Sequence, residues 1–334
     1  MGRANRARAA VVAAPFATLL ATPLMMLTML SMLMLSPRAV LAQSGQEGIF
    51  LLLPVGARAV GMGEAVVAQR GGSDMLWWNP SAIAGDSTGG HEVALHHSTT
   101  VVGQGNALAV VWPGQNGTTY GLAINVLDLG QQTLTDEQGI SVGVATPTDY
   151  SVAATYAFSP IPWLALGATA KHVEAAIPCS GECSGLGIAS SRSNAVDVGL
   201  QLRPDMIPLT IGAAARNLGI AGTAGRPGRL DVGADYRVLT FARGSDSVEV
   251  HGAASLVSTL KFDSTTARFG TDVVVDGRLH VRAGYIRDPV NGSGGALGVG
   301  LQSGKLVFDI GRTYGGLTGT NDKPPTYFSL RYLW

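Results

Sequence analysis

The chain has 334 residues, of which 46% are hydrophobic, 14% are charged and 45 are glycine. This hydrophobic content, with so little charge, excludes a disordered chain. The 23 Lys and Arg residues equal the 23 Asp and Glu residues, so no basic excess points to nucleic acid as a partner.

Residues 1–42 have the features of a secretory signal peptide. Three arginines near the N-terminus precede an uncharged run over residues 9–37, and Val40-Leu41-Ala42 then provides a cleavage site. We expect the exported protein to begin near Gln43. An uncleaved membrane anchor is the alternative, because the apolar run is long enough to span a bilayer.

Two blocks of sequence stand out in residues 43–90, ahead of the first expected strand. The first is Gly56-Ala57-Arg58-Ala59-Val60-Gly61-Met62-Gly63, and the second is Trp77-Trp78-Asn79-Pro80-Ser81. Together they resemble the PorV/PorQ family of outer-membrane proteins, which is related to the FadL-type transporters. The resemblance implies a fourteen-stranded barrel whose N-terminal segment, residues 43–90, enters the lumen as a plug.

The residue chemistry of the two blocks is consistent with a plug that contains short helices. Gly61 and Gly63 allow close backbone approach to a barrel wall. Asn79 followed by Pro80 is a helix start, with Asn as the cap and Pro at the first helical position. We expect Trp77 and Trp78 to pack the helix against the wall; stacking on a ligand is the alternative.

From residue 91 to the C-terminus, apolar residues alternate with polar ones in segments of about ten residues, as in Arg229–Val238. This length matches strands that cross an outer membrane better than the shorter strands of a soluble sandwich. The sequence predicts an all-β fold, a transmembrane antiparallel barrel of about fourteen strands over residues 91–334. The segments begin near residues 91, 105, 117, 149, 162, 193, 208, 229, 247, 265, 278, 294, 305 and 326.

The connections between these segments are long and short in turn, as in bacterial outer-membrane barrels. Long connections at 129–148, 175–192, 218–228 and 314–325 are expected outside the cell. Tight turns at 159–161, 203–205, 276–277 and 303–304 are expected in the periplasm. Charged residues of both signs fall on the inward faces, and we expect them to pair with one another and with the plug.

The two cysteines, Cys179 and Cys183, lie in one of the long outside loops. In an exported protein this pair predicts a disulfide that constrains the loop. Zinc would require two further ligands, which the neighbouring sequence does not supply.

The C-terminal segment Thr326–Trp334 places Phe328, Leu330, Tyr332 and Trp334 on one face. It resembles the terminal strand that the bacterial barrel-assembly machinery recognises, so we predict that Phe328, Tyr332 and Trp334 form this assembly signal. The terminal aromatic residues also suit the interface with outer-membrane lipid. The alternative is an ordinary closing strand of a soluble sheet.

The sequence contains no catalytic or cofactor-binding constellation that its context supports. Ser258 and Lys261 have Ser-x-x-Lys spacing without a companion motif, and the Gly-rich stretches lack the patterns that bind phosphate. His96 and His97 are adjacent on a strand and so point to opposite faces, which disfavours a metal site. We predict neither an enzyme nor a bound cofactor.

Three functions are therefore candidates for this chain. The family resemblance implies a type IX secretion component in the bacterial outer membrane, which binds exported cargo proteins at its extracellular loops and contacts other secretion components. The alternative is a FadL-like channel for hydrophobic small molecules. An outer-membrane enzyme is the third, and it lacks a catalytic constellation.

Overall fold

A computed structural model of the protein describes residues 49–85, 90–181, 191–219, 228–244, 246–290, 292–315 and 324–334. The predicted signal peptide over residues 1–42 lies outside these residues, as does the start of the predicted plug. Of the helices described, none is long and apolar enough to cross a membrane.

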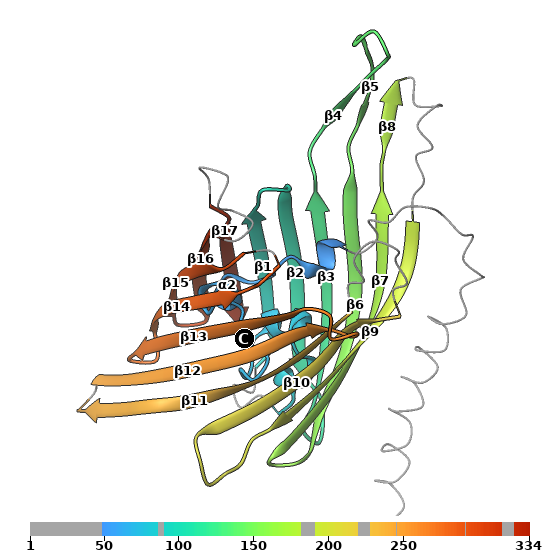
Figure 1. The fold of residues 1–334 in the computed structure, drawn as a ribbon. Helices are drawn as coiled ribbons and strands as arrows, with labels where there is room; N and C mark the ends of the chain where they lie inside the picture. Colours follow the sequence, from blue (N-terminus) through green and yellow to red (C-terminus); the bar gives the residue numbers. More distant parts are fainter. Residues whose placement is uncertain are drawn as a thin grey trace, which may run out of the picture. The chain divides into compact units, whose positions relative to one another are not determined.

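Fourteen antiparallel strands form a closed barrel (Figure 1). The barrel closes where β1 pairs with β17, from Glu92 opposite Leu333 to Thr99 opposite Thr326. The predicted fold class is confirmed, and each predicted strand start lies within two residues of an observed one. The strands are β1 (Glu92–Thr99), β2 (Gln104–Pro113), β3 (Thr118–Asp128), β6 (Thr148–Ile161), β7 (Leu164–Ala176), β9 (Ser191–Leu202), β10 (Leu209–Leu218), β11 (Arg229–Arg243), β12 (Asp246–Thr259), β13 (Thr265–Val275), β14 (Leu279–Arg287), β15 (Gly294–Ser303), β16 (Leu306–Gly315) and β17 (Thr326–Leu333).

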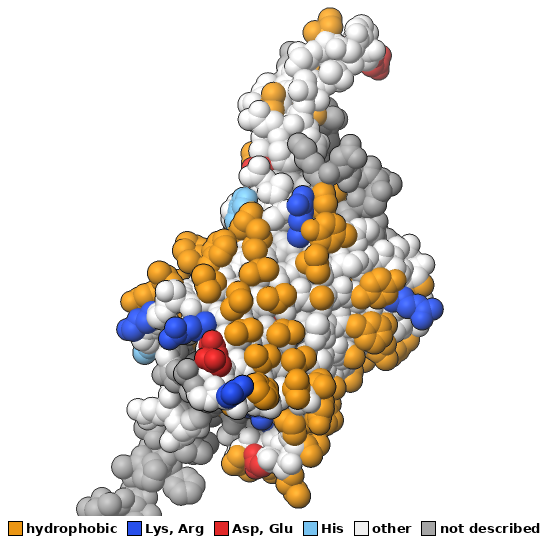
Figure 2. Space-filling model, turned by 90° about the vertical axis from the view of Figure 1, so that its left-hand side faces the viewer, with side chains coloured by type: hydrophobic (Ala, Val, Ile, Leu, Met, Phe, Trp, Pro, Cys, Tyr) orange, Lys and Arg blue, Asp and Glu red, His pale blue; other side chains and the backbone are white. Residues whose placement is uncertain are grey.

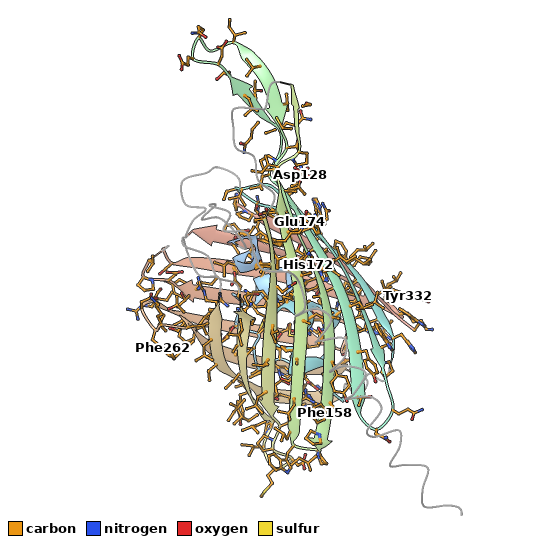
Figure 3. The ribbon with its side chains drawn as sticks, turned by 90° about the vertical axis from the view of Figure 1, so that its right-hand side faces the viewer. Asp128, Phe158, His172, Glu174, Phe262 and Tyr332 are labelled. Atoms are coloured by element: carbon orange, nitrogen blue, oxygen red, sulfur yellow. The ribbon has the colours of Figure 1, made fainter. Side chains whose placement is uncertain are left out.

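The two rims of the barrel differ in their connections. We call the rim that carries the connections 129–147 and 177–190 the long-loop rim, and the other the short-turn rim. At the long-loop rim, β4 (Gln132–Thr135), β5 (Ser141–Ala145) and β8 (Cys179–Gly181) form a separate three-stranded sheet, which extends away from the barrel (Figure 1). Asp128 and Glu174 lie toward its base, and Phe158 lies toward the opposite rim (Figure 3).

One predicted turn is wrong in position. Residues 159–161 belong to β6, and the turn follows at Pro162 and Trp163. The register between β6 and β7 shifts between Phe158 and Ile161. Such an irregularity accommodates Pro160, which cannot donate a hydrogen bond to a regular ladder.

The outer surface of the barrel is apolar and exposed. Outward side chains such as Leu95, Leu122, Phe269 and Leu297 are half-exposed, and apolar side chains cover much of one face in Figure 2. Soluble monomers rarely expose so large an apolar surface, whereas a transmembrane barrel presents it to lipid. Near the short-turn rim, the ring centroids of Tyr332 and Trp334 are 5.9 Å apart, as expected for an interfacial aromatic girdle.

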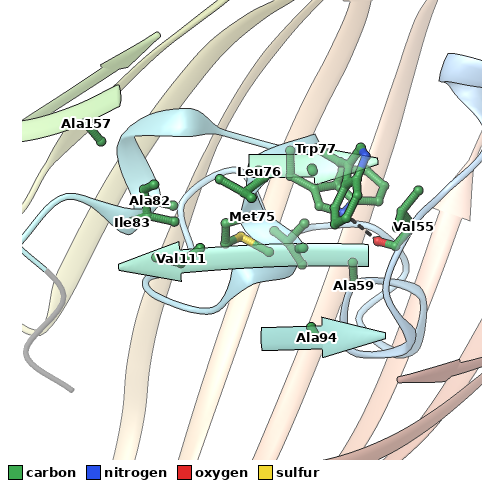
Figure 4. Close-up of a cluster of buried hydrophobic side chains, with 14 of the residues drawn as sticks. Val55, Ala59, Met75, Leu76, Trp77, Ala82, Ile83, Ala94, Val111 and Ala157 are labelled. Atoms are coloured by element: carbon green, nitrogen blue, oxygen red, sulfur yellow. Dashed lines mark hydrogen bonds between the residues drawn. The ribbon is translucent and has the colours of Figure 1, made fainter. Parts of the chain in front are cut away.

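The segment 49–85 fills the barrel interior with four short helices. They are η1 (Ile49–Leu52), α2 (Ala57–Gly61), η2 (Ser73–Trp77) and η3 (Pro80–Ile83). The main apolar cluster lies between this segment and the wall (Figure 4). The plug contributes large side chains, among them Met75, Leu76 and Ile83, while the wall contributes mainly alanines, such as Ala94 and Ala157. The interior is therefore packed by the plug.

Candidate functional site

The first plug block lies directly on the backbone of β14 and β15. A Cβ atom on Gly63 would lie 2.6 Å from the Tyr285 nitrogen, and one on Gly61 would lie 2.9 Å from Gly298 Cα. The wall also leaves no room for a side chain at this contact, because a Cβ on Gly284 would lie 2.0 Å from the Gly63 nitrogen. Glycine on both surfaces is what allows α2 and the turn after it to approach the wall so closely.

An ion pair joins the two halves of the plug. Arg58 donates from Nε to Asp74 Oδ2 (3.0 Å) and from Nη2 to Asp74 Oδ1 (2.7 Å), and Nη2 also donates to the Gly71 carbonyl (2.6 Å). Burial raises the pKa of the Asp74 carboxyl, but Arg58 and Arg331 outweigh burial and hold this pKa below its ordinary value. Two parallel hydrogen bonds with opposite charges make a strong, directional link.

The second plug block is held against β7 and β9, on another part of the wall. The Asn79 side chain accepts from the Ser81 backbone nitrogen (3.1 Å) and donates to the Val67 carbonyl (2.6 Å), so Asn79 caps η3 as predicted. A Cβ on Gly199 would lie 2.0 Å from Asn79 Oδ1, and one on Gly167 would lie 2.4 Å from the Pro80 carbonyl carbon. Glycines again determine where the plug rests.

Both tryptophans of this block are buried in plug packing. Trp78 Nε1 donates to the Val55 carbonyl (2.9 Å; Figure 4). The Arg216 guanidinium lies over the Trp78 ring, 5.1 Å from its centroid. Trp77 meets the His96 ring edge-to-face at 5.4 Å. The packing interpretation therefore accounts for both side chains, which are only 8% and 3% exposed.

Charged side chains inside the barrel are paired, as the mixture of signs predicted. Arg282 Nη1 lies 2.6 Å from Asp309 Oδ1, and Arg282 Nε lies 3.2 Å from Asp272 Oδ2. One pair crosses from wall to plug, with Arg268 Nη2 at 2.7 Å from Glu64 Oε2. The Arg282 pairs link strands of the wall and the Arg268 pair links the wall to the plug, so the described part of the lumen is lined by both signs and not by the single sign that selects ions in charged pores.

A small cleft of about 20 Å³ lies between the plug and the wall, on the side of the plug toward the long-loop rim. Its apolar lining comes largely from the plug and includes Phe50, Leu53 and Val55; β3 contributes Leu127 and β17 contributes Tyr327. This volume is close to that of one water molecule. A larger occupant would have to displace the plug residues.

A second apolar space lies on the lipid-facing side of the same wall. This groove of about 500 Å³ is lined by outward side chains that include Leu95, Leu108, Phe308 and Phe328. The cleft and the groove share four lining residues on β1 and β2: His96, His97, Asn106 and Ala107. His96 faces inward and bonds to Ser329 (2.8 Å), whereas His97 faces outward and bonds to Asn106 (2.9 Å). The two apolar spaces therefore lie on opposite faces of the β1–β2 pair, one layer of wall apart.

The opposite side of the plug faces a polar vestibule. This space of about 750 Å³ near the short-turn rim is lined by charged residues such as Arg70, Arg203, Asp235 and Asp272. Arg203 closes its inner end, because its guanidinium donates to plug carbonyls at Ala84 (2.8 Å) and Ser81 (3.2 Å). The plug therefore separates an apolar cleft from a polar vestibule.

Phe328 lines the lipid-facing groove, and the other remaining predicted residues lie outside both apolar spaces. Cys179 lies in β8 and is disulfide-bonded; Cys183 lies outside the described residues, so its pairing with Cys179 stays a prediction. Phe328 and Tyr332 face outward on β17. The backbone of Trp334 exchanges two hydrogen bonds with His91 (3.0 and 3.1 Å). Their role in assembly also stays a prediction. Among the described residues, no cluster of His, Cys, Asp and Glu could hold a metal ion.

Sequence reasoning missed several residues of the site. The wall glycines that receive the plug, such as Gly284 and Gly199, look like ordinary strand positions in the sequence. Their regular recurrence at inward positions was the available signal, because glycine weakens a strand and marks close backbone approach. Phe50 and Leu53 belong to the apolar run of residues 49–53, which carries no motif that indicates a role.

Comparisons with known proteins support the fold. No protein-family model and no curated protein matches the chain. Among solved structures, the chain is similar to the Ralstonia pickettii toluene transporter TbuX, with a TM-score of 0.53 and 11% identity over 83% of this chain and 97% of that one. It is similar to the CymD monoaromatic hydrocarbon channel, with a TM-score of 0.56 and 14% identity over 84% and 97%. A Pseudomonas aeruginosa FadL homologue gives a TM-score of 0.50 and 10% identity over 84% and 98%.

These likenesses concern the fold, since the identities are low. The FadL-type barrel that the sequence resemblance implied is therefore confirmed as an architecture. The PorV/PorQ part of the resemblance stays a prediction.

Proposed function

We propose that the chain is an outer-membrane channel for small hydrophobic molecules, with its long-loop rim outside the cell and its short-turn rim in the periplasm. The observation that carries this proposal is the pair of apolar spaces that share His96, His97, Asn106 and Ala107. The solved structures of similar fold include toluene transporters and monoaromatic hydrocarbon channels, which supports the same class of solute.

The route follows from the polarity of the spaces. A hydrophobic molecule that enters from the long-loop rim meets the apolar cleft, whereas the polar vestibule beyond the plug would not solvate it. The lipid-facing groove offers an apolar destination across one layer of wall. The β1–β2 ladder is continuous from Glu92 opposite Val111 to Thr99 opposite Gln104, so passage requires η1 to move and the ladder to open locally.

The experiment places a large side chain at one of the residues that the two spaces share, so that it fills the cleft. Ala107 is buried and faces inward, so Ala107→Trp should occupy the cleft and reduce uptake of radiolabelled toluene in cells that lack their own hydrocarbon channel. Val110→Trp, on the same strand but outside both spaces, is the control. A folded Ala107→Trp barrel with unchanged uptake would refute the proposal.

A second variant keeps a small side chain at residue 107 while the barrel assembles, so that a loss of uptake cannot be attributed to misassembly. Ala107→Cys should assemble and transport normally. A benzyl thiosulfonate, added after assembly, should then block toluene uptake only in this variant.

The secretion function remains a second candidate, because the sheet β4–β5–β8 projects from the long-loop rim with its edge strands β4 and β8 each paired on one side only within the described residues. Removing residues 176–191 distinguishes the two functions. A channel should keep its toluene uptake. A secretion component should lose co-purification of exported proteins, and that loss from a barrel that shows no toluene uptake before or after the deletion would favour secretion.

A further inference from the structure

Strand β11 extends well past its neighbour β10 at the short-turn rim. The β10–β11 ladder ends where Leu209 is opposite Tyr236, and the last bond is from the Arg237 nitrogen to the Pro208 carbonyl (3.0 Å). On its other side β11 stays paired with β12 as far as Arg243 opposite Asp246. Residues 238–243 therefore form a strand edge with which no other described strand pairs.

The backbone groups on this edge can be assigned from the neighbouring strands. Asp276 lies on the β13 side of Ser247 in β12. The Asp276 backbone nitrogen donates to the Ser247 carbonyl (2.8 Å), and the Ser247 nitrogen donates to Asp276 Oδ1 (2.7 Å). Hydrogen-bonding direction alternates along a strand, so the residues of β12 that bond to β11 are those on either side of Ser247. Given the register, the N–H and C=O groups of Thr240 and Ala242 face the open edge.

This edge is unsuited to both of the environments that could surround it. Val238, Leu239 and Phe241 are 60%, 54% and 57% exposed. If the edge lies in lipid, its backbone groups have no water to replace the missing partners. If it lies in water, it exposes apolar side chains beside a template for strand pairing. An added strand would satisfy the backbone and cover the apolar residues in either case.

A second copy of the chain does not fit this role. Copies in one membrane share their orientation, so a two-fold axis along the membrane normal would keep β11 of both copies running toward the same rim. With strands tilted by about 35–45°, the two edges would cross at about 70–90° and could not form a ladder.

We infer that the β11 edge, residues 238–243, binds an extended segment of a separate protein on the short-turn side as an added strand. The polar vestibule reaches this place, since Met206, Leu209, Asp235 and Arg237 line it. The segment should alternate, with apolar residues on the side of Leu239 and Phe241 and polar residues on the vestibule side. This recognition mode takes its affinity from main-chain hydrogen bonds. Binding of this segment does not depend on which solute the channel conducts.

The test uses the full-length protein in detergent and a synthetic peptide of ten alternating Thr and Val residues with a Lys at each end. Thr240→Pro and Ala242→Pro each remove an N–H that faces the open edge and none that the β11–β12 ladder uses, so the hairpin should persist. Thr240→Val keeps the N–H and is the matched control.

We expect the peptide to slow amide hydrogen exchange at Thr240 and Ala242 in the native chain and in Thr240→Val. Each proline variant should bind the peptide at least tenfold more weakly. Disulfide formation between Ala242→Cys and cysteines placed along the peptide should vary with a period of two residues, as a strand requires.

Three results would overturn the inference. Absence of peptide binding would show that the edge is not a docking site. Slow exchange at Thr240 and Ala242 before peptide is added would show that the chain already covers its own edge. Dimers of Ala242→Cys joined through that residue in the native membrane would identify a second copy as the occupant.

Discussion

The contact between the plug and the wall makes a sharp prediction for Gly284→Ala. The added Cβ would lie 2.0 Å from the Gly63 nitrogen, 2.4 Å from the Met62 carbonyl carbon and 2.5 Å from Gly63 Cα. All three are backbone atoms, so no side chain can rotate to relieve the contact. Ordinary contact begins near 3.4 Å, so the plug must withdraw from β14 by about 1 Å or more.

The expected cost follows from overpacking of a closely packed interior. Such substitutions cost about 1–3 kcal/mol, and a cost of about 2 kcal/mol raises the opening equilibrium of the plug about thirtyfold. Withdrawal also stretches the pair between Arg268 and Glu64, now 2.7 Å apart. Hydrogen exchange of plug residues 56–65 should therefore accelerate about thirtyfold while the barrel strands exchange as before.

A control on the adjacent strand isolates the contact. Gly295→Ala places its Cβ no closer than 3.9 Å to any neighbour, at the Gly284 carbonyl oxygen. Neither Gly284 nor Gly295 has a positive φ, so both accept alanine without backbone strain. If exchange of the plug in Gly284→Ala stays within twofold of that in Gly295→Ala, the plug is not held by close backbone contact and the reasoning fails.

Further predictions concern the plug ion pair and the two ends of the chain. Arg58→Met should destabilise the plug by about 3–5 kcal/mol in denaturant unfolding, because it leaves Asp74 buried without its main partner; a change below about 1 kcal/mol would contradict this. Because the pKa of Asp74 is lowered in the folded state, its stabilising contribution is present above the ordinary carboxyl range and is lost as pH falls through the lowered value. The protection of plug amides, relative to their intrinsic exchange rates at each pH, should thus fall in acid, and Asp74→Asn should abolish that fall. Deleting Trp334 should lower the yield in the outer membrane without reducing export to the periplasm, and unchanged assembly would show that the residue only packs at the interface. N-terminal sequencing of outer-membrane material should begin near Gln43, whereas a start at Met1 would exclude cleavage.

Much of the barrel could be predicted because a strand that faces lipid on one side and the lumen on the other must alternate in polarity. That constraint acts residue by residue, as in Arg229–Val238, so it can be recognised locally without knowledge of any partner strand. The Asn79 cap and the Pro80 helix start were predictable for the same reason, since both depend on groups within a few residues.

The sheet β4–β5–β8 was not predicted. Its strands are short, and β8 (Cys179–Gly181) pairs with β5 (Ser141–Ala145) across a long stretch of chain. The regions appeared as loops because three to five residues carry too little alternation to distinguish a strand from a loop.

The sequence by itself determined the closed barrel, its strand starts, its two unlike rims and the existence of a segment with helix signals ahead of the first strand, since each depends on neighbouring residues. Only the tertiary structure decided how the lumen is filled. Charged residues of both signs fall on the inward strand positions, yet the plug supplies the apolar side chains of Phe50, Leu53 and Val55 to the cleft. Contacts such as Gly63 with Gly284 join residues far apart in the chain, and packing of that kind depends on shapes that meet only after the barrel closes.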